Sequence, residues 1–220
     1  MKQTMKTLHY LAIASLLILG TPVLKASEQD QVVQAAHTIK SFKAIPEKSI
    51  PPYVMHDAKG LAILTVIKGA FVFSGKIGQG VVVARAADGW SGPSFIKTGG
   101  VGFGAQIGGE ATEFVVVLNT RAAVKAFAHG GNVQLGGALS VAAGPYGRTA
   151  AGDVTPKAAI YTYSRSQGLF AGASLEGTVI ATDKDGNAHY YGREVGAREV
   201  LSGQVAPPAR AAVLLRTLGR

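Results

Sequence analysis

Glycine recurs inside the apolar runs of this chain, and this feature restricts the possible fold more than any other. It fills 29 of 220 positions without the three-residue period of collagen. Gly102, Gly104 and Gly172, for example, lie inside patterns that otherwise suit strands. Because glycine weakens a strand, its repeated use there indicates bends, bulges or close backbone approach. The sequence therefore favours a strongly curved or closed sheet.

The composition is that of one folded domain. Apolar residues make up 47% of the chain and charged residues 16%, a balance too apolar for disorder. A length of 220 residues suits one domain with a single core. The sequence contains no cysteine, so disulfides, a lipid-modified cysteine and cysteine-bound metals are excluded. Stability must come from packing.

Four segments have the sequence features of helices. Residues 28–45 repeat apolar side chains every three or four positions, as an amphipathic helix does, and Lys40 and Lys43 lie among them. The other helices are predicted over residues 51–60, from a cap at Asn119 or Thr120 through Phe127, and over residues 209–218.

After residue 60 the pattern becomes that of strands. Three successive antiparallel strands are predicted over residues 61–67, 70–76 and 81–86. With a hairpin loop between the last two, Lys76 would face Val81 and share a charged face with Arg85. Further strand-like runs lie at 99–109, 114–118, 133–143, 158–164 and 169–181, and Asp185-Gly186 predicts a hairpin turn. The predicted fold class is α+β, with a predominantly antiparallel, glycine-rich, strongly curved or barrel-like sheet and a few short peripheral helices.

The amino-terminal segment predicts export. Lys2 and Lys6 precede an apolar run, and Leu24-Lys25-Ala26 suits a cleavage site, as in a secretory signal peptide. The apolar run is shorter than the roughly 20 residues of a spanning helix. We therefore expect residues 1–26 to be a cleavable signal peptide and residues 27–220 to be one domain, in which 27–49 are the amphipathic helix and its linker. The protein is expected to be periplasmic or secreted.

The predicted mature domain is basic. Cleavage would remove three lysines and no acidic residue, so the net charge would fall from +9 to +6. A basic exported domain meets anionic lipid headgroups and polysaccharides rather than nucleic acid. The alternative is that the charge serves only solubility.

No motif marks a catalytic or metal site. The run Gly100-Val-Gly102-Phe-Gly-Ala105 is close to a dinucleotide-binding fingerprint, but a strand-like run follows where that fingerprint needs a helix. The histidines stand singly, without the spacing of metal ligands. Asp183-Lys-Asp185-Gly-Asn187 lacks the length of a calcium loop. We therefore expect no cofactor, no metal and no enzymatic activity.

Several ordered motifs resemble those of the SYLF domain family. They are Ala58-Lys-Gly-Leu-Ala-Ile63, Ser74-Gly-Lys-Ile-Gly-Gln-Gly-Val-Val-Val-Ala-Arg85, Trp90-Ser-Gly-Pro-Ser94, Gly102-Phe-Gly-Ala-Gln-Ile-Gly108, Gly144-Pro-Tyr-Gly-Arg148 and Gly168-Leu-Phe-Ala-Gly-Ala-Ser-Leu-Glu-Gly177. The resemblance covers residues 50–218. After Arg148, where the family usually has an acidic residue, this chain continues with Thr149.

The resemblance implies a lipid-binding module. Eukaryotic members bind phosphoinositides, partly through a basic amphipathic N-terminal helix, and some bind actin filaments. The resemblance places that helix around residues 32–48, with Lys40, Lys43 and Lys48 as lipid-binding candidates. The further candidates are Lys76, Arg85, Arg148 and Arg165. Since an exported domain would meet neither cytosolic phosphoinositides nor actin, we transfer only the binding of anionic phospholipid headgroups, such as those of phosphatidylglycerol or cardiolipin.

The predicted function is thus a non-enzymatic module that docks on anionic phospholipid membrane surfaces. One alternative is a structural or protein-interaction domain that binds a protein partner of the cell envelope and ignores lipid. Another is an enzyme acting on a lipid or glycan, which would need a polar pocket of converging catalytic groups. The sequence leaves open whether the helix of residues 28–45 packs on the sheet or inserts into a membrane.

Overall fold

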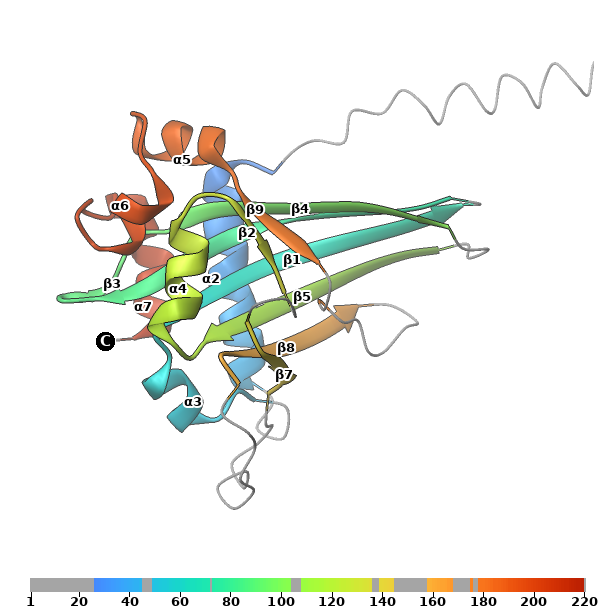
Figure 1. The fold of residues 1–220 in the computed structure, drawn as a ribbon, viewed down its shortest axis with the longest axis horizontal. Coiled ribbons are helices and arrows are strands. Elements are labelled where there is room, and N and C mark those ends of the chain that lie inside the picture. The colour runs from blue at the N-terminus through green and yellow to red at the C-terminus, as the bar shows by residue number, and fades with distance from the viewer. Residues whose placement is uncertain are drawn as a thin grey trace, which may run out of the picture.

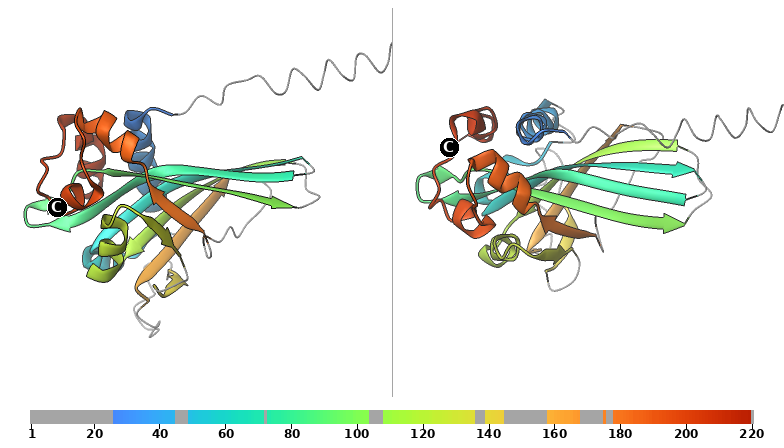
Figure 2. Two further views of the ribbon diagram at one scale, coloured as in Figure 1. Left: turned by 45° about the horizontal axis from the view of Figure 1, so that its top comes forward. Right: turned by 90° about the horizontal axis from the view of Figure 1, so that it is seen from above.

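A curved sheet with helices on both of its faces forms the body of the molecule (Figure 1, Figure 2). This computed structural model describes residues 26–44, 49–71, 73–103, 108–135, 139–144, 158–167, 175 and 178–219. The predicted signal peptide lies outside the described residues, except for Ala26.

The helices form two groups. On one face of the sheet lie α2 (Glu28–Ala44), α5 (Lys184–Tyr191) and α7 (Ala212–Leu218), and on the other lie α4 (Arg121–Ala128) and α6 (Ala197–Leu201). The short α3 (Pro52–Asp57) follows α2, and the 3-10 turn η3 (Ala209–Ala211) leads into α7. The four predicted helices are therefore confirmed as α2, α3, α4 and α7, and Thr120 caps α4 by accepting a hydrogen bond from the Ala123 amide at 3.1 Å.

In the described chain the sheet contains nine strands. Their bounds are β1 (Gly60–Phe71), β2 (Phe73–Ala86), β3 (Gly89–Trp90), β4 (Ser94–Phe103), β5 (Gly108–Leu118), β6 (Asn132–Gln134), β7 (Val141–Ala143), β8 (Ile160–Gln167) and β9 (Val179–Thr182). The order is β6-β9-β4-β2-β1-β5-β8-β7, with β3 paired to β2, and among these described strands only the β7–β8 pair is parallel. The sheet curls like half of a barrel (Figure 2), which confirms the predicted fold class.

The predicted set of three strands is wrong, because β2 continues through residues 77–80 as one long strand paired with β1. The glycines there allow close contact between strands rather than a turn. A Cβ on Gly80 would lie 2.1 Å from the Ile63 carbonyl oxygen. In the observed register Lys76 faces Lys68, and an odd number of positions separates it from Arg85, so these two residues point to opposite faces of the sheet.

The predicted hairpin at Asp185-Gly186 is also wrong, because these residues belong to α5. Asp183 follows β9 directly and caps the helix, and its carboxylate accepts a hydrogen bond from the Gly186 amide at 3.3 Å. Asn187, which is fully buried, accepts a hydrogen bond from the Phe95 amide at 2.7 Å. A helix cap and a contact with a distant strand therefore override the local turn signal.

Each face of the sheet has its own apolar core. Along β2, Val81 packs in the core beneath α2 together with Ile39, whereas the next residue, Val82, packs on the opposite face with Phe127 of α4. This alternation follows from the two-residue period of a strand. Both faces of the central strands are therefore covered near α2 and α4.

Candidate functional site

The apolar side of α2 faces the sheet. The side chains that define it are at most 5% exposed: Val32, Ala35, Ala36, Ile39 and Phe42. Near the end of the helix, the Lys43 ammonium donates a hydrogen bond to the Thr217 carbonyl at 2.7 Å. Near its start, the Glu28 carboxylate lies 2.7 Å from His189 Nδ1. The amphipathic helix thus packs on the sheet, and its apolar residues could enter a membrane only if this core opened.

A buried carboxylate lies beneath α2. Glu113 of β5 is 3% exposed, and its Oε1 accepts hydrogen bonds from Gln34 Nε2 at 2.8 Å and Thr38 Oγ1 at 3.1 Å. Its Oε2 is buried and has no hydrogen-bond partner among the described residues. No local sequence motif marks Glu113 as functional. The sequence signal it does carry is an acidic side chain directly before the apolar run of residues 114–118, at a position that faces the core.

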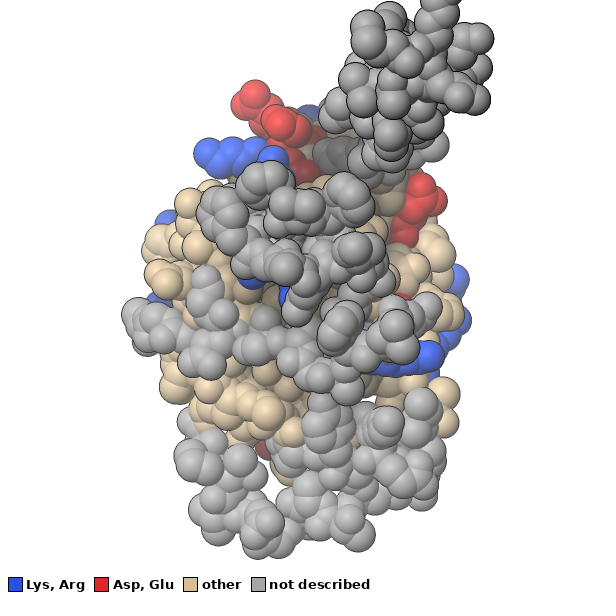
Figure 3. Space-filling model, turned by 90° about the vertical axis from the view of Figure 1, so that its right-hand side faces the viewer, with Lys and Arg blue, Asp and Glu red and all other residues tan. Residues whose placement is uncertain are grey.

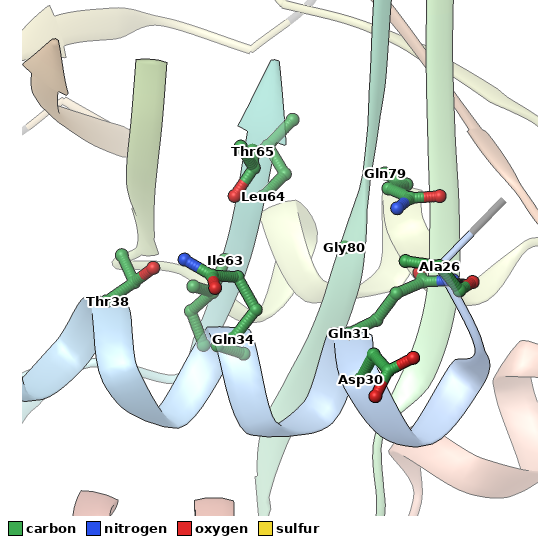
Figure 4. Close-up of a pocket in the computed structure, with 11 residues that line it drawn as sticks. Ala26, Asp30, Gln31, Gln34, Thr38, Ile63, Leu64, Thr65, Gln79 and Gly80 are labelled. Atoms are coloured by element: carbon green, nitrogen blue, oxygen red, sulfur yellow. Dashed lines mark hydrogen bonds between the residues drawn. The ribbon is translucent and has the colours of Figure 1, made fainter. Parts of the chain in front are cut away.

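A cavity of about 240 Å³ lies beside this carboxylate, between α2 and the strands β1 and β2 (Figure 4). Gln34 and Thr38, which bond Glu113, also line the cavity. Gln31 and Asp30 lie nearer the start of the helix, and Thr65 and Gln79 line the strand side. The described lining offers amides, hydroxyls and one carboxylate, but no pairing of a nucleophile with a base.

The central strands extend beyond the helices at one end of the molecule (Figure 1). We call this part, from residues 67–68 of β1 and 76–77 of β2 outward, the free end of the sheet. Here Ile67 and Ile77 face each other across β1 and β2 and are 58% and 60% exposed. Adjacent exposed isoleucines form an apolar surface that the described chain leaves uncovered.

Two lysines lie at the same place on the opposite face. Lys68 and Lys76 face each other in the β1–β2 register, and Lys76 Nζ donates a hydrogen bond to Thr178 Oγ1 at 3.3 Å. On its other side, Lys68 is in register with Glu110 of β5. Like charges directly opposite each other destabilise a sheet, so this pair favours a nearby anion. Figure 3 looks toward this end and shows Lys and Arg side chains around its margins, together with Asp and Glu side chains.

The structure distributes the predicted lipid-binding residues over several surfaces. Lys40 is exposed on the outer side of α2. Lys43 and Arg85 line one pocket at the end of α2. Lys76 lies at the free end, and Arg165 of β8 is in register with Glu113 on the face that α2 covers. Lys48 and Arg148 lie outside the described residues.

The described residues lack two kinds of feature. They contain no cluster of three or more histidine and acidic side chains placed to hold a metal ion. They also contain no helix with the length and apolarity needed to cross a bilayer.

The described residues form an α+β fold with exposed apolar and basic surfaces. The family described as "Las17-binding protein actin regulator", Ysc84, matches residues 99–220. An SH3 domain-containing protein of Schizosaccharomyces pombe is 51% identical over 177 residues, which are 78% of this chain and 41% of that protein. The chain therefore belongs to the Ysc84 family, also called SYLF, which confirms the resemblance found in the sequence.

Two further relatives show how much of a longer protein this chain matches. LAS seventeen-binding protein 3 of Saccharomyces cerevisiae is 46% identical over 78% of this chain and 39% of its own length. The human SH3 domain-containing YSC84-like protein 1 is 44% identical over 86% of this chain and 58% of its own length. The chain thus spans about two fifths of the fungal relatives and somewhat more than half of the human one.

Proposed function

We propose that this protein is a non-enzymatic binding module that docks on anionic phospholipid membranes through the free end of its sheet. The observation that carries the proposal is the exposed pair Ile67 and Ile77, which lies beyond the helices, with Lys68 and Lys76 at the same level on the opposite face of the sheet. This arrangement differs from insertion of α2, whose apolar residues are buried.

The isoleucines supply the apolar part of the docking energy. Moving an isoleucine from water into an apolar environment gains roughly 1.5 to 3 kcal/mol, and each of these side chains is more than half exposed. Because a pair of this size gives only modest affinity, docking through it is reversible.

The lysines supply the electrostatic part. A basic side chain near an anionic membrane surface contributes about 1 kcal/mol. Lys68 is exposed, and the aliphatic stem of Lys76 runs along β4, where a Cβ on Gly100 would lie 2.9 Å from Lys76 Cε. Long lysine side chains can keep their ammonium groups at the headgroups while neighbouring apolar groups enter the bilayer. If residues 1–26 direct export, the membranes concerned are those of the cell envelope, and phosphatidylglycerol and cardiolipin are the anionic lipids we expect there.

A protein partner is the second candidate. It is favoured by the names of the relatives, one of which is called a LAS seventeen-binding protein and others SH3 domain-containing proteins. In that case the same exposed isoleucines would pack against a protein, and docking would not depend on anionic lipid.

Co-pelleting with vesicles separates the two candidates. The purified protein is mixed with phosphatidylcholine vesicles that contain or lack phosphatidylglycerol. We expect binding only to the anionic vesicles, falling steeply as salt rises, because physiological salt shortens the reach of charges to about 8 Å. The double variant Ile67→Ser/Ile77→Ser should bind at least tenfold more weakly.

Two control variants change comparable residues elsewhere. Val33→Ser alters an exposed apolar residue of α2 that is 47% exposed, and Lys40→Gln removes an exposed positive charge from the same helix. Both should bind vesicles nearly as well as the unchanged protein. Equal binding of the isoleucine variant, or no vesicle binding at all, would contradict docking through the free end.

A further inference from the structure

A second pocket, of about 410 Å³, lies at the other end of the helical layer, between the end of α2, α3 and the end of α7. Apolar side chains from all three helices line it: Ile39 and Phe42 from α2, Met55 from α3 and Leu218 from α7. Pockets that hold small molecules have roughly 300 to 1,000 Å³ and mainly apolar walls. The size and the lining therefore suit a small apolar group or a short stretch of chain.

Two basic side chains from separate elements line the same pocket, Lys43 and Arg85. Within the described residues the Lys43 ammonium donates one hydrogen bond, to the Thr217 carbonyl at 2.7 Å, which uses one of its three N–H donors. This bond holds the charge where the ends of α2 and α7 meet. His56 also lines the pocket, and its Nδ1 lies 2.9 Å from the Asp57 carboxylate.

Arg85 has no partner anion in the part of the chain that the structure describes. Its guanidinium carbon lies 4.0 Å from the centre of the Trp90 ring, and burial lowers the pKa of its side chain. Among the described residues, no carboxylate lies within ion-pair distance of it. A partly desolvated charge costs free energy unless an anion compensates it. The described lining of the pocket contains no acidic residue that could do so.

We infer that this pocket binds one molecule of a single-chain anionic lipid, of which a fatty acid is the simplest example. The acyl chain packs against Ile39, Phe42 and Leu218, and the anionic head contacts Lys43 and Arg85. A neutral chain would leave the two cations uncompensated, and a small free anion would leave the apolar walls exposed to water. Only a molecule with both parts matches the whole lining.

This site is separate from the proposed docking surface. Arg85 lies near the end of β2 that pairs with β3, whereas Ile77 lies toward the free end of the same strand. Lipid binding in this pocket therefore does not depend on membrane docking through the free end. An experiment can exclude one of the two without excluding the other.

The single tryptophan of the chain provides the measurement, since Trp90 stacks on the Arg85 guanidinium. Bromine quenches tryptophan fluorescence only at short range. The protein is titrated with 2-bromododecanoate, whose bromine lies next to the carboxylate and so near Trp90, below its micelle concentration, and with 2-bromododecan-1-ol as the neutral control. We expect saturable quenching by the carboxylate with one molecule bound per protein, and at least tenfold weaker quenching by the alcohol.

Variants test the two halves of the site. Lys43→Gln and Arg85→Gln should each weaken carboxylate binding about fivefold to tenfold, while Lys184→Gln, at an exposed position of α5, should leave it unchanged. Met55→Phe places a larger side chain in the pocket and should weaken the binding of both brominated compounds. Because Arg85 contacts the reporter, its variant is also measured by calorimetry with unbrominated dodecanoate.

Several results would overturn the inference: equal binding of the acid and the alcohol, full affinity in both cation variants, or no saturable quenching. Vesicle pelleting of Met55→Phe distinguishes this site from the free end. If Met55→Phe loses fatty acid but still pellets with anionic vesicles, the two sites are independent. If the two activities are lost together in a folded protein, the pocket is not the separate site inferred here.

Discussion

The Thr38 hydroxyl of α2 donates a hydrogen bond to the Glu113 carboxylate of β5 at 3.1 Å, and both residues are at most 3% exposed. Gln34 donates a second hydrogen bond to the same oxygen at 2.8 Å. A buried carboxylate costs free energy unless donors surround it, so these two residues of α2 stabilise a charge that belongs to the sheet. The helix is thus held by polar as well as apolar contacts.

Replacing Thr38 with valine tests this connection. The two side chains have nearly the same shape, but valine cannot donate, so the buried carboxylate would lose one of its two described donors. We expect Thr38→Val to lower the free energy of unfolding by about 1.5 to 3 kcal/mol. Urea denaturation measures it, with Val33→Thr at an exposed position of α2 as the control. An unchanged midpoint would show that the hydrogen bond contributes nothing.

Gly80 should tolerate no side chain. A Cβ there would lie 2.1 Å from the Ile63 carbonyl oxygen and 2.6 Å from Leu64 Cα, and both atoms belong to the backbone of β1. Gly80→Ala should therefore destabilise the protein by about 2 to 4 kcal/mol, since the strands would have to separate. The control is Gly131→Ala, because no atom lies within 4 Å of a Cβ at that position. Thermal unfolding should show almost no change in its melting temperature. Equal melting of the two variants would contradict the close strand contact.

The pair Tyr190 and Tyr191 predicts a loss of stability at alkaline pH. Burial raises the pKa of Tyr190 to about 12, against the opposing effect of the Arg210 charge. Burial and the neighbouring Tyr190 also raise the pKa of Tyr191. A tyrosine in the unfolded chain titrates near about 10, so the unfolded state loses its proton first. Stability from these groups is fully present below about pH 10 and is lost as the pH rises toward about 12.

Tyr190→Phe removes one of these ionisations and keeps the ring beside Arg210, whose guanidinium carbon lies 4.2 Å from the ring centre. Urea denaturation over this pH range should show a smaller alkaline loss for the variant than for the unchanged protein. Parallel pH profiles for the two proteins would mean that Tyr190 ionises as easily in the folded state as in the unfolded state.

Asn187 should be essential for the attachment of α5 to the sheet. It is fully buried, accepts a hydrogen bond from the Phe95 amide at 2.7 Å and donates one to Ser94 Oγ at 3.2 Å. Asn187→Ala leaves the Phe95 amide without its acceptor, and we expect a loss of about 1 to 3 kcal/mol in chemical denaturation. The matched change Lys184→Ala, at an exposed position of the same helix, should have little effect. A loss of the same size in both would indicate an effect of helix propensity alone.

The sequence by itself determined the elements whose signals are local. The three-to-four-residue apolar period of α2, the prolines at the start of α3 and the Thr120 cap of α4 depend on neighbouring residues only, and each helix formed where it was predicted. The curved sheet was predicted correctly from strand-like runs that contain glycine, but Gly104 and Gly172 lie outside the described residues. Gly78 and Gly80, which pack closely against neighbouring strands, had been assigned to a turn. The family motifs were likewise contiguous enough to be recognised.

The tertiary structure alone decided how these elements meet. Whether residues 77–80 turn or continue depends on whether β1 lies close enough to exclude a side chain, and whether Asp185-Gly186 turns depends on an asparagine contact with β4. Lys43 and Arg85 share a pocket only because α2 packs across the sheet, and Glu113 finds its donors for the same reason. Local patterns specify short-range backbone preferences, whereas register, burial and the pairing of distant side chains are set by contacts between segments far apart in the chain.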